Sequence, residues 1–248
     1  NGFTLGNGSS EVNSSGETYI YMAIRRPHKP PTVATEVFAI DTLGGTSPTP
    51  PGFNSGFPVD MAWWVLTTTG GVLANTRLQG ERDLLLYGNN SEDPQSNRKF
   101  DYQNGFLDVT STNSDYLCWM FRRAPGFLDV VAYTGTGSAT TINHNLGVAP
   151  EMMWIKNRID AESWSVYHKD KGADKNMWIN DSGAGITHDR FNNTAPTDSV
   201  FSVKTDNAVN SSGDTYIAYL FATLDGISKV GSYTGTGSDL NVDCGFTA

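Results

Sequence analysis

The sequence predicts an all-β protein built from tandem β-sandwich-like repeat units of about 98 residues. Three observations predict this class. Short apolar runs rich in Val, Thr, Tyr and Trp alternate with clusters of Gly, Asn, Ser and Pro, as strands alternate with turns. No run keeps a 3.6-residue period, so long amphipathic helices are not expected. Two motifs recur at fixed separations, which is typical of repeat architectures.

The two motifs set the length of the unit. Val-Asn-Ser-Ser-Gly-Glu/Asp-Thr-Tyr-Ile occupies residues 12–20 and again 209–217, an offset of 197 residues, and a degenerate copy near Asn113 lies 97 residues after the first and 100 before the second. Tyr-Thr-Gly-Thr-Gly-Ser occupies residues 133–138 and 233–238, an offset of 100 residues. These offsets define a unit of about 98 residues.

The motif positions predict four segments. Residues 1–29 are expected to be the C-terminal part of a preceding unit, 30–126 a divergent unit, 127–226 a well-kept unit, and 227–248 the start of a following unit. The simplest interpretation is a piece of a longer tandem array. The alternative is that the two partial ends pair, within the chain or between copies.

Strands are expected wherever a short apolar run lies between turn clusters. In chain order these runs are 18–24, 38–41, 62–67, 84–87, 116–121, 129–134, 152–156, 163–168, 176–179, 200–204, 215–222 and 230–234. Those at 19–24, 116–121 and 216–221 are apolar on both alternating faces. A strand of that kind is covered on both sides, so a neighbouring unit or a partner chain is expected against the second face.

The composition excludes several classes of protein. Gly, Thr, Ser and Asn number 26, 26, 21 and 20, and charged residues are 17% of the chain, against about 25% on average. The net charge of −9 disfavours binding to nucleic acid, which needs clustered Lys and Arg. The sequence has no apolar run of 18 residues or more, so a transmembrane helix is not expected. Two cysteines, Cys118 and Cys244, are too few for a disulfide scaffold.

No pattern predicts catalysis, a metal or a cofactor. The histidines lack the spacing of a metal site, and no Gly-x-Ser-x-Gly elbow occurs. His144, in Asn-His-Asn, aligns with Cys244 in the next unit, so we interpret it as a residue that stabilises a turn. Cys118 aligns with Ala218 and is interpreted as a small buried residue, and a Cys118–Cys244 bridge is not expected.

The tryptophans could serve the core or a ligand. Trp154 lies near the unit position of Trp63, which indicates core packing for both. Trp164 and Trp178 are the candidate ligand-binding residues, because aromatic planes stack on sugar rings; the alternative for each is the core.

The best-kept segments of the chain carry a family resemblance. They are 127–137, 142–156, 164–168, 193–196 and 209–219, and they resemble the tandem repeat domain of tailed-phage structural proteins, common in marine and cyanobacterial phages. The likeness extends over 127–248 and 1–27 and is weak over 30–126. It implies a place in a tail fibre or a similar part of the virion and transfers no catalytic residue.

Three functional hypotheses follow. The leading one is a non-enzymatic virion protein, in a tail fibre, spike or head decoration, that contributes to architecture and host adsorption and assembles with copies of itself and other virion proteins. The second is a carbohydrate-binding module of the same particle that recognises host surface glycans. The third is a polysaccharide depolymerase, which needs two facing carboxylates.

Overall fold

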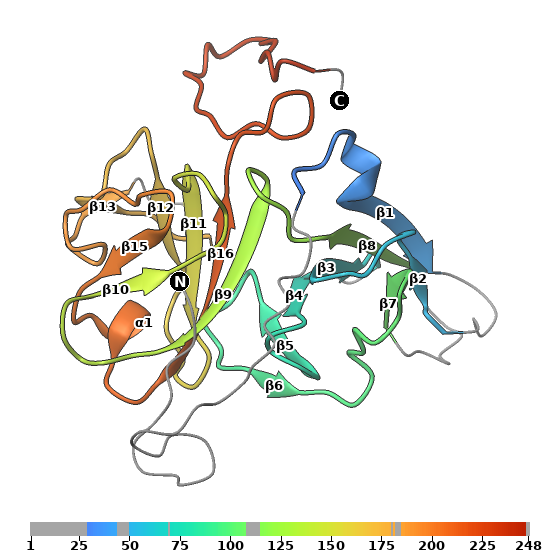
Figure 1. Ribbon diagram of the computed structural model, residues 1–248, viewed down its shortest axis with the longest axis horizontal. Helices are drawn as coiled ribbons and strands as arrows, with labels where there is room; N and C mark the ends of the chain where they lie inside the picture. The colour runs from blue at the N-terminus through green and yellow to red at the C-terminus, as the bar shows by residue number, and fades with distance from the viewer. Residues whose placement is uncertain are drawn as a thin grey trace, which may run out of the picture.

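The computed structural model describes residues 29–43, 50–68, 70–107, 115–179, 181 and 185–246. Its regular structure is almost entirely β, with one 3₁₀ turn and one short helix in the described part (Figure 1). In chain order the elements are η1 (Ala34–Glu36), β1 (Phe38–Leu43), β2 (Phe53–Asn54), β3 (Met61–Leu66), β4 (Val72–Thr76), β5 (Arg82–Leu85), β6 (Asp93–Pro94), β7 (Gly105–Phe106), β8 (Tyr116–Phe121), β9 (Leu128–Thr134), β10 (Thr140–Asn143), β11 (Met152–Asn157), β12 (Ser165–His168), β13 (Lys175–Asn176), β14 (Ile186–Thr187), β15 (Val200–Val203), α1 (Asn207–Asn210) and β16 (Thr215–Phe221).

Two antiparallel sheets dominate the fold. One has six strands in the order β1-β8-β3-β4-β5-β6, and the other has four in the order β12-β11-β16-β9. Three small two-stranded sheets, β10-β15, β13-β14 and β2-β7, lie beside them. The strands of the first sheet fall within the predicted unit 30–126 and those of the second within 127–226, so the all-β class and the two β units are confirmed.

The two sheets share one plan. The order β1-β8-β3-β4 corresponds to β9-β16-β11-β12, with the apolar motif strand second in each. In the first sheet Phe121 lies opposite both Phe38 and Met61. In the second, Phe221 lies opposite both Leu128 and Met152. The repeat in the sequence is therefore also a repeat in strand order and register.

Backbone contacts at the end of each unit repeat as well. The N–H of Asp60 donates to the carbonyl of Phe121, and that of Glu151 donates to the carbonyl of Phe221, both at 2.9 Å. The side chains of Asp60 and Glu151 each accept the next available backbone N–H, from Arg123 and Thr223, also at 2.9 Å. An acidic residue before β3 or β11 thus ties down the chain that leaves β8 or β16.

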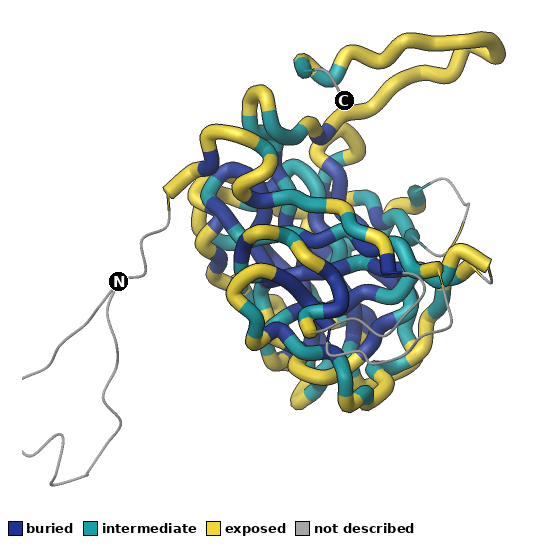
Figure 2. The backbone as a smooth tube through the Cα atoms, turned by 90° about the vertical axis from the view of Figure 1, so that its right-hand side faces the viewer, coloured by how far each residue is buried: buried dark blue, intermediate teal, exposed yellow. Residues whose placement is uncertain are grey.

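The core has three parts, and the central strand of the second unit, β16, buries both faces between two of them. Along β16, Tyr216, Ala218 and Leu220 belong to the core of the second unit. Ile217 and Tyr219 point the other way, into a core shared with the first unit. A third core lies on the outer face of the first sheet around Cys118 and Met120. Figure 2 shows the buried stretches of backbone gathered in the middle of the molecule.

The cover predicted for the two-faced strands is therefore the neighbouring unit. In β8, Cys118 and Met120 face the outer core while Phe121 faces the shared one. In β3, Trp64 faces outward and Trp63 inward. The sheets of the two units pack face to face, and each has its own further cover.

Most of the expected strands form. The expectation for 116–121 matches β8 residue for residue, and those for 38–41, 62–67, 84–87, 129–134, 152–156, 163–168, 200–204 and 215–222 overlap β1, β3, β5, β9, β11, β12, β15 and β16. The expectation for 176–179 is met only at Asn176. The expected strand at 18–24 and the first copy of the Val-Asn-Ser-Ser-Gly motif lie outside the described residues.

One strand expectation is wrong. Residues 230–234 match β9 in sequence but form no strand, because no neighbouring strand of the described chain pairs with them. In β9 that partner is β16. The sequence does not predict β4 and β10, which carry polar residues, or the two-residue strands β2, β6, β7 and β14.

The cysteines and the helices bear on two further expectations. Both cysteines are free, and Cys118 is fully buried beside Trp64 in the register of β8 and β3, as its alignment with Ala218 predicted. Within the described residues, no helix has the length and apolar character needed to cross a membrane.

Candidate functional site at the junction of the two units

The junction of the two units is built on stacked tryptophans. Trp63 and Trp154 occupy the third position of β3 and β11, and their rings stack 5.1 Å apart at an angle of 17°. Each also packs on the last residue of its own central strand, with centroids 4.7 Å apart for Trp63 and Phe121 and 5.0 Å for Trp154 and Phe221. Offset stacking of this kind adds to the free energy of burial, so the pair is a strong anchor.

Polar contacts cross the same junction. Arg158 of the second unit binds Glu92 of the first through two bonds, Nε to Oε1 at 2.6 Å and Nη2 to Oε2 at 3.0 Å. The N–H of Glu92 donates to the carbonyl of Arg158 at 2.9 Å. A bidentate arginine–carboxylate pair fixes orientation as well as distance. The pair therefore sets how the acidic segment of the first unit meets the second.

A second polar contact lies inside the shared core. The hydroxyl of Tyr219 donates to Gln79 Oε1 at 3.2 Å, and Gln79 Nε2 donates to Glu92 at 3.0 Å. Both Tyr219 and Gln79 are buried. A buried polar atom without a partner costs free energy, so this chain of bonds lets Tyr219 face an apolar core.

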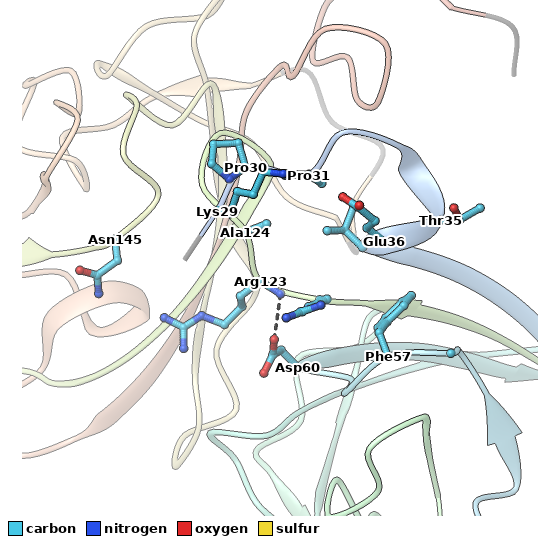
Figure 3. A pocket seen from close by; sticks show the side chains of 13 residues that line it. Lys29, Pro30, Pro31, Thr35, Glu36, Phe57, Asp60, Arg123, Ala124 and Asn145 are labelled. Atoms are coloured by element: carbon cyan, nitrogen blue, oxygen red, sulfur yellow. Dashed lines mark hydrogen bonds between the residues drawn. The ribbon is translucent and has the colours of Figure 1, made fainter. Parts of the chain in front are cut away.

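A cleft opens at one end of the junction, where η1 and the chain leaving β8 meet (Figure 3). Its volume is about 700 Å³, and residues of both units line it, from Glu36 to Asp60 and Arg123 of the first and Asn145 of the second, together with Lys29. Phe57 forms part of its wall but is itself buried. Charged side chains and apolar ones such as Pro30 and Pro31 thus share the wall of the cleft.

The charges around the cleft are largely engaged with each other. Asp60 binds Arg77 at 3.3 Å as well as the N–H of Arg123, and the guanidinium of Arg123 binds Asp129 at 2.6 Å (Figure 3). Arg122 also lines the cleft and makes no side-chain hydrogen bond or ion pair to the residues that the structure describes. Chemically, the cleft can accept a carboxylate or a similar anion at Arg122.

The structure separates the two candidate ligand-binding residues. Trp164 is 0% exposed, lies in the shared core, and donates its Nε1–H to the carbonyl of Leu85 at 2.8 Å. It offers no face to a ligand and serves the junction. Trp178 is half-buried, with the guanidinium of Arg190 at 6.0 Å from its ring. The two residues are not brought together in one site.

His144 stabilises a turn, as its replacement by Cys244 in the next unit predicted. Its Nδ1 accepts the N–H of Leu146 at 3.2 Å, so the proton is on Nε2, which lies 3.2 Å from the carbonyl of Thr197. Burial disfavours the charged ring and lowers the pKa of His144 below its usual 6.5. The neutral tautomer joins the loop before β11 to the loop before β15.

The second unit also brings its two repeated motifs together. The N–H of Thr136 donates to Asn210 Oδ1 at 2.8 Å, the N–H of Gly137 to the carbonyl of Asn210 at 3.0 Å, and Asn210 Nδ2 to the carbonyl of Ser138 at 2.6 Å. Asn210 is fully buried. One asparagine thus clamps the Tyr-Thr-Gly-Thr-Gly-Ser turn from both sides, a role that the motif spacing alone does not reveal.

Lys156 is a buried cation that no pattern in the sequence singles out. It is fully buried at the end of β11 and donates to the carbonyls of Asn157 at 2.6 Å and Asp160 at 3.2 Å. Burial lowers its pKa to about 8, against the attraction of Glu162 and Glu92. The sequence does not predict the burial of Lys156, because lysine side chains are most often at the surface.

The buried carboxylates are each paired with an arginine. Asp60, Asp83 and Asp129 bind Arg77, Arg98 and Arg123. In the part of the chain that the structure describes, no group of three His, Cys, Asp or Glu residues is placed to hold a metal ion. These carboxylates therefore organise the fold.

A comparison with protein families places the chain. The family model described as a domain of unknown function, DUF7483, matches residues 108–248, more than half of the chain. The chain belongs to this family. The DUF7483 region runs from just before β8 through the second unit to the tail, so it contains both copies of the Tyr-Thr-Gly-Thr-Gly-Ser turn. No curated protein and no solved structure matches the chain.

Proposed function

We propose that this protein is a non-enzymatic structural component of a phage virion, of the tail-fibre, spike or head-decoration kind, that contributes to particle architecture and host adsorption. One observation carries the proposal: the central strand β16 has both faces buried, one by its own unit and one by its neighbour, and β8 packs Phe121 against the same shared core. Repeat proteins gain stability from such interfaces between neighbours.

The phage assignment is supported by the resemblance of 127–248 and 1–27 to tandem repeats of tailed-phage proteins. Its place is then the surface of the particle, on the tail or a head appendage, and its partners are copies of itself and other virion proteins. The many neutral polar residues suit this role, because they supply turns to a repeated β unit without adding charge.

The test is to locate the protein in the particles of the phage that encodes it. Particles purified by density gradient are analysed by mass spectrometry and labelled with antibodies against residues 127–226 for electron microscopy. We expect several copies per particle and label on the tail or a head appendage. Abundant protein in the infected cell but none in the particle would overturn the proposal.

A carbohydrate-binding role in the same particle is the second candidate, and half-buried Trp178 with Arg190 favours it. Aromatic side chains of this exposure provide platforms for sugar rings. The substitution Trp178→Ala should weaken adsorption of particles to host cells, whereas Trp164→Phe, within the shared core, serves as the matched control. Equal adsorption by wild type and Trp178→Ala argues against this candidate.

A further inference from the structure

The C-terminal tail carries a second copy of the turn that is clamped in the second unit. In the first copy Thr136 Oγ1 donates to the carbonyl of Ser138 at 2.9 Å, and in the second Thr236 Oγ1 donates to that of Ser238 at 3.1 Å. The φ angles of Gly137 and Gly237 are +70° and +76°. The two turns therefore have the same local shape.

The first copy is docked with close contact. In addition to the bonds from Asn210, the N–H of Gly135 donates to the carbonyl of Asp214 at 2.8 Å, and the N–H of Gly213 to the carbonyl of Gly135 at 3.0 Å. A Cβ on Gly135 would lie 2.0 Å from the carbonyl oxygen of Ser211. Tyr133 completes the contact, because its ring stacks on Tyr216 at 5.1 Å.

The second copy has none of these contacts. Tyr233 is 72% exposed, and residues 231–243 are all exposed. The N–H groups of Gly235 and Gly237 have no backbone partner among the described residues, and a Cβ on Gly235 would meet nothing within 4 Å. The tail projects away from the body of the molecule (Figure 2). A preformed binding turn therefore faces outward.

We propose that the turn at 233–238 binds the segment 12–20 of a second copy of this chain, with the hydrogen bonds that join 133–138 to 209–217. Segment 12–20 differs from 209–217 only by Glu17 in place of Asp214, and Asn13 stands at the position of Asn210. The proposed contact deepens the architectural role proposed above and rests on it only for its biological purpose. Self-association itself can be tested on the isolated chain.

The order of the two motifs supports a second copy as the occupant. In the second unit the turn precedes its clamp by 74 residues, from Thr136 to Asn210, whereas within this chain segment 12–20 precedes the turn at 233–238. The tail of one copy followed by the first residues of another restores the order found in the unit. Such a contact is heterologous, since the two copies use different surfaces, and it propagates from head to tail.

The test uses light scattering and sedimentation of the 248-residue chain over a range of concentrations. Wild type should associate as concentration rises. Gly235→Val should weaken association about tenfold or more, because a Cβ fits the free tail but would meet the second copy's backbone at Ser14, the position equivalent to Ser211. Gly231→Ala, equally free of neighbours in the same tail, is the matched control and should associate as wild type does.

A mixing experiment identifies the pair of surfaces. Asn13→Leu should weaken association to a similar degree as Gly235→Val does. A mixture of the two variants keeps one intact tail and one intact clamp, so it should form heterodimers that grow no further. Wild type that stays monomeric, Gly235→Val that associates normally, or a mixture without heterodimers would each overturn the proposal. Absence from phage particles would overturn only the biological setting.

Discussion

The two β units share strand order and register. They differ in the interactions that stabilise the side of each unit that faces away from the junction. The first relies on a buried ion pair: Arg98 Nε and Nη2 bind Asp83 at 2.6 and 2.7 Å, and the guanidinium lies 4.4 Å from the ring of Trp64. The second relies mainly on neutral groups, with Asn210 clamping the Gly-rich turn and Asn157 donating to the carbonyl of Asn207 at 3.1 Å.

The comparison shows which positions have the same chemistry in both units. Two pairs of positions keep their chemistry in both units: Trp63 and Trp154 at the junction, and Asp60 and Glu151 before β3 and β11. The outer cores use different side chains, and each is covered by its own unit's loops.

Substitutions at the stacked tryptophans, which both units share, should lower stability the most. Trp63→Ala and Trp154→Ala should each lower the free energy of unfolding by about 3–4 kcal/mol, since each removes a large, partly buried side chain that packs against the shared core. Urea denaturation followed by fluorescence measures the loss. Trp178→Ala, outside the core, is the control and should cost less. A Trp63→Ala chain as stable as Trp178→Ala would contradict the central role of the junction.

The ion pair of the first unit gives the next effect. Asp83→Ala leaves the buried Arg98 without its carboxylate and should lower the free energy of unfolding by about 3 kcal/mol. The double substitution Asp83→Leu with Arg98→Met removes both charges and should recover much of that loss in the same denaturation assay. If the double variant is less stable than Asp83→Ala, the interpretation as an unpaired buried charge is wrong.

The neutral clamp of the second unit gives a smaller effect. Asn210→Ala removes the side-chain bonds to Thr136 and Ser138 and should cost about 1–3 kcal/mol. Hydrogen exchange should show faster exchange at the N–H of Thr136 while β16 keeps its protection. Unchanged exchange at Thr136 would show that the turn does not depend on its clamp.

The smallest effect is a pH dependence confined to the second unit. The pKa of His144 is lowered by burial, so the unfolded chain binds its proton at a higher pH than the folded chain does. The folded state therefore loses stability as pH falls through about 6.5, the ordinary pKa of histidine. His144→Asn should flatten that part of the stability–pH curve relative to wild type. An identical slope in both proteins would exclude the contribution of His144.

The sequence predicts the repeated framework better than the contacts that complete it. The apolar faces of 116–121 and 216–221 required a second cover. The neighbouring unit supplies it in full for 216–221 and, in 116–121, for Phe121, while Leu117 and Trp119 stay half-buried. Trp164 could not be assigned to core or surface from its neighbours in the chain, since its partner Leu85 is 79 residues away. The strand expected at 230–234 failed for the same reason, because a strand needs a partner that local sequence does not specify.

The stacking of Trp63 on Trp154 has a geometric consequence for any longer array. Because equivalent residues meet, the two units join through like faces, which makes the contact isologous and self-closing. A unit paired in this way has no second copy of that face to offer. An array built on this contact therefore counts its units in twos, and its growth beyond each pair depends on a surface of another kind.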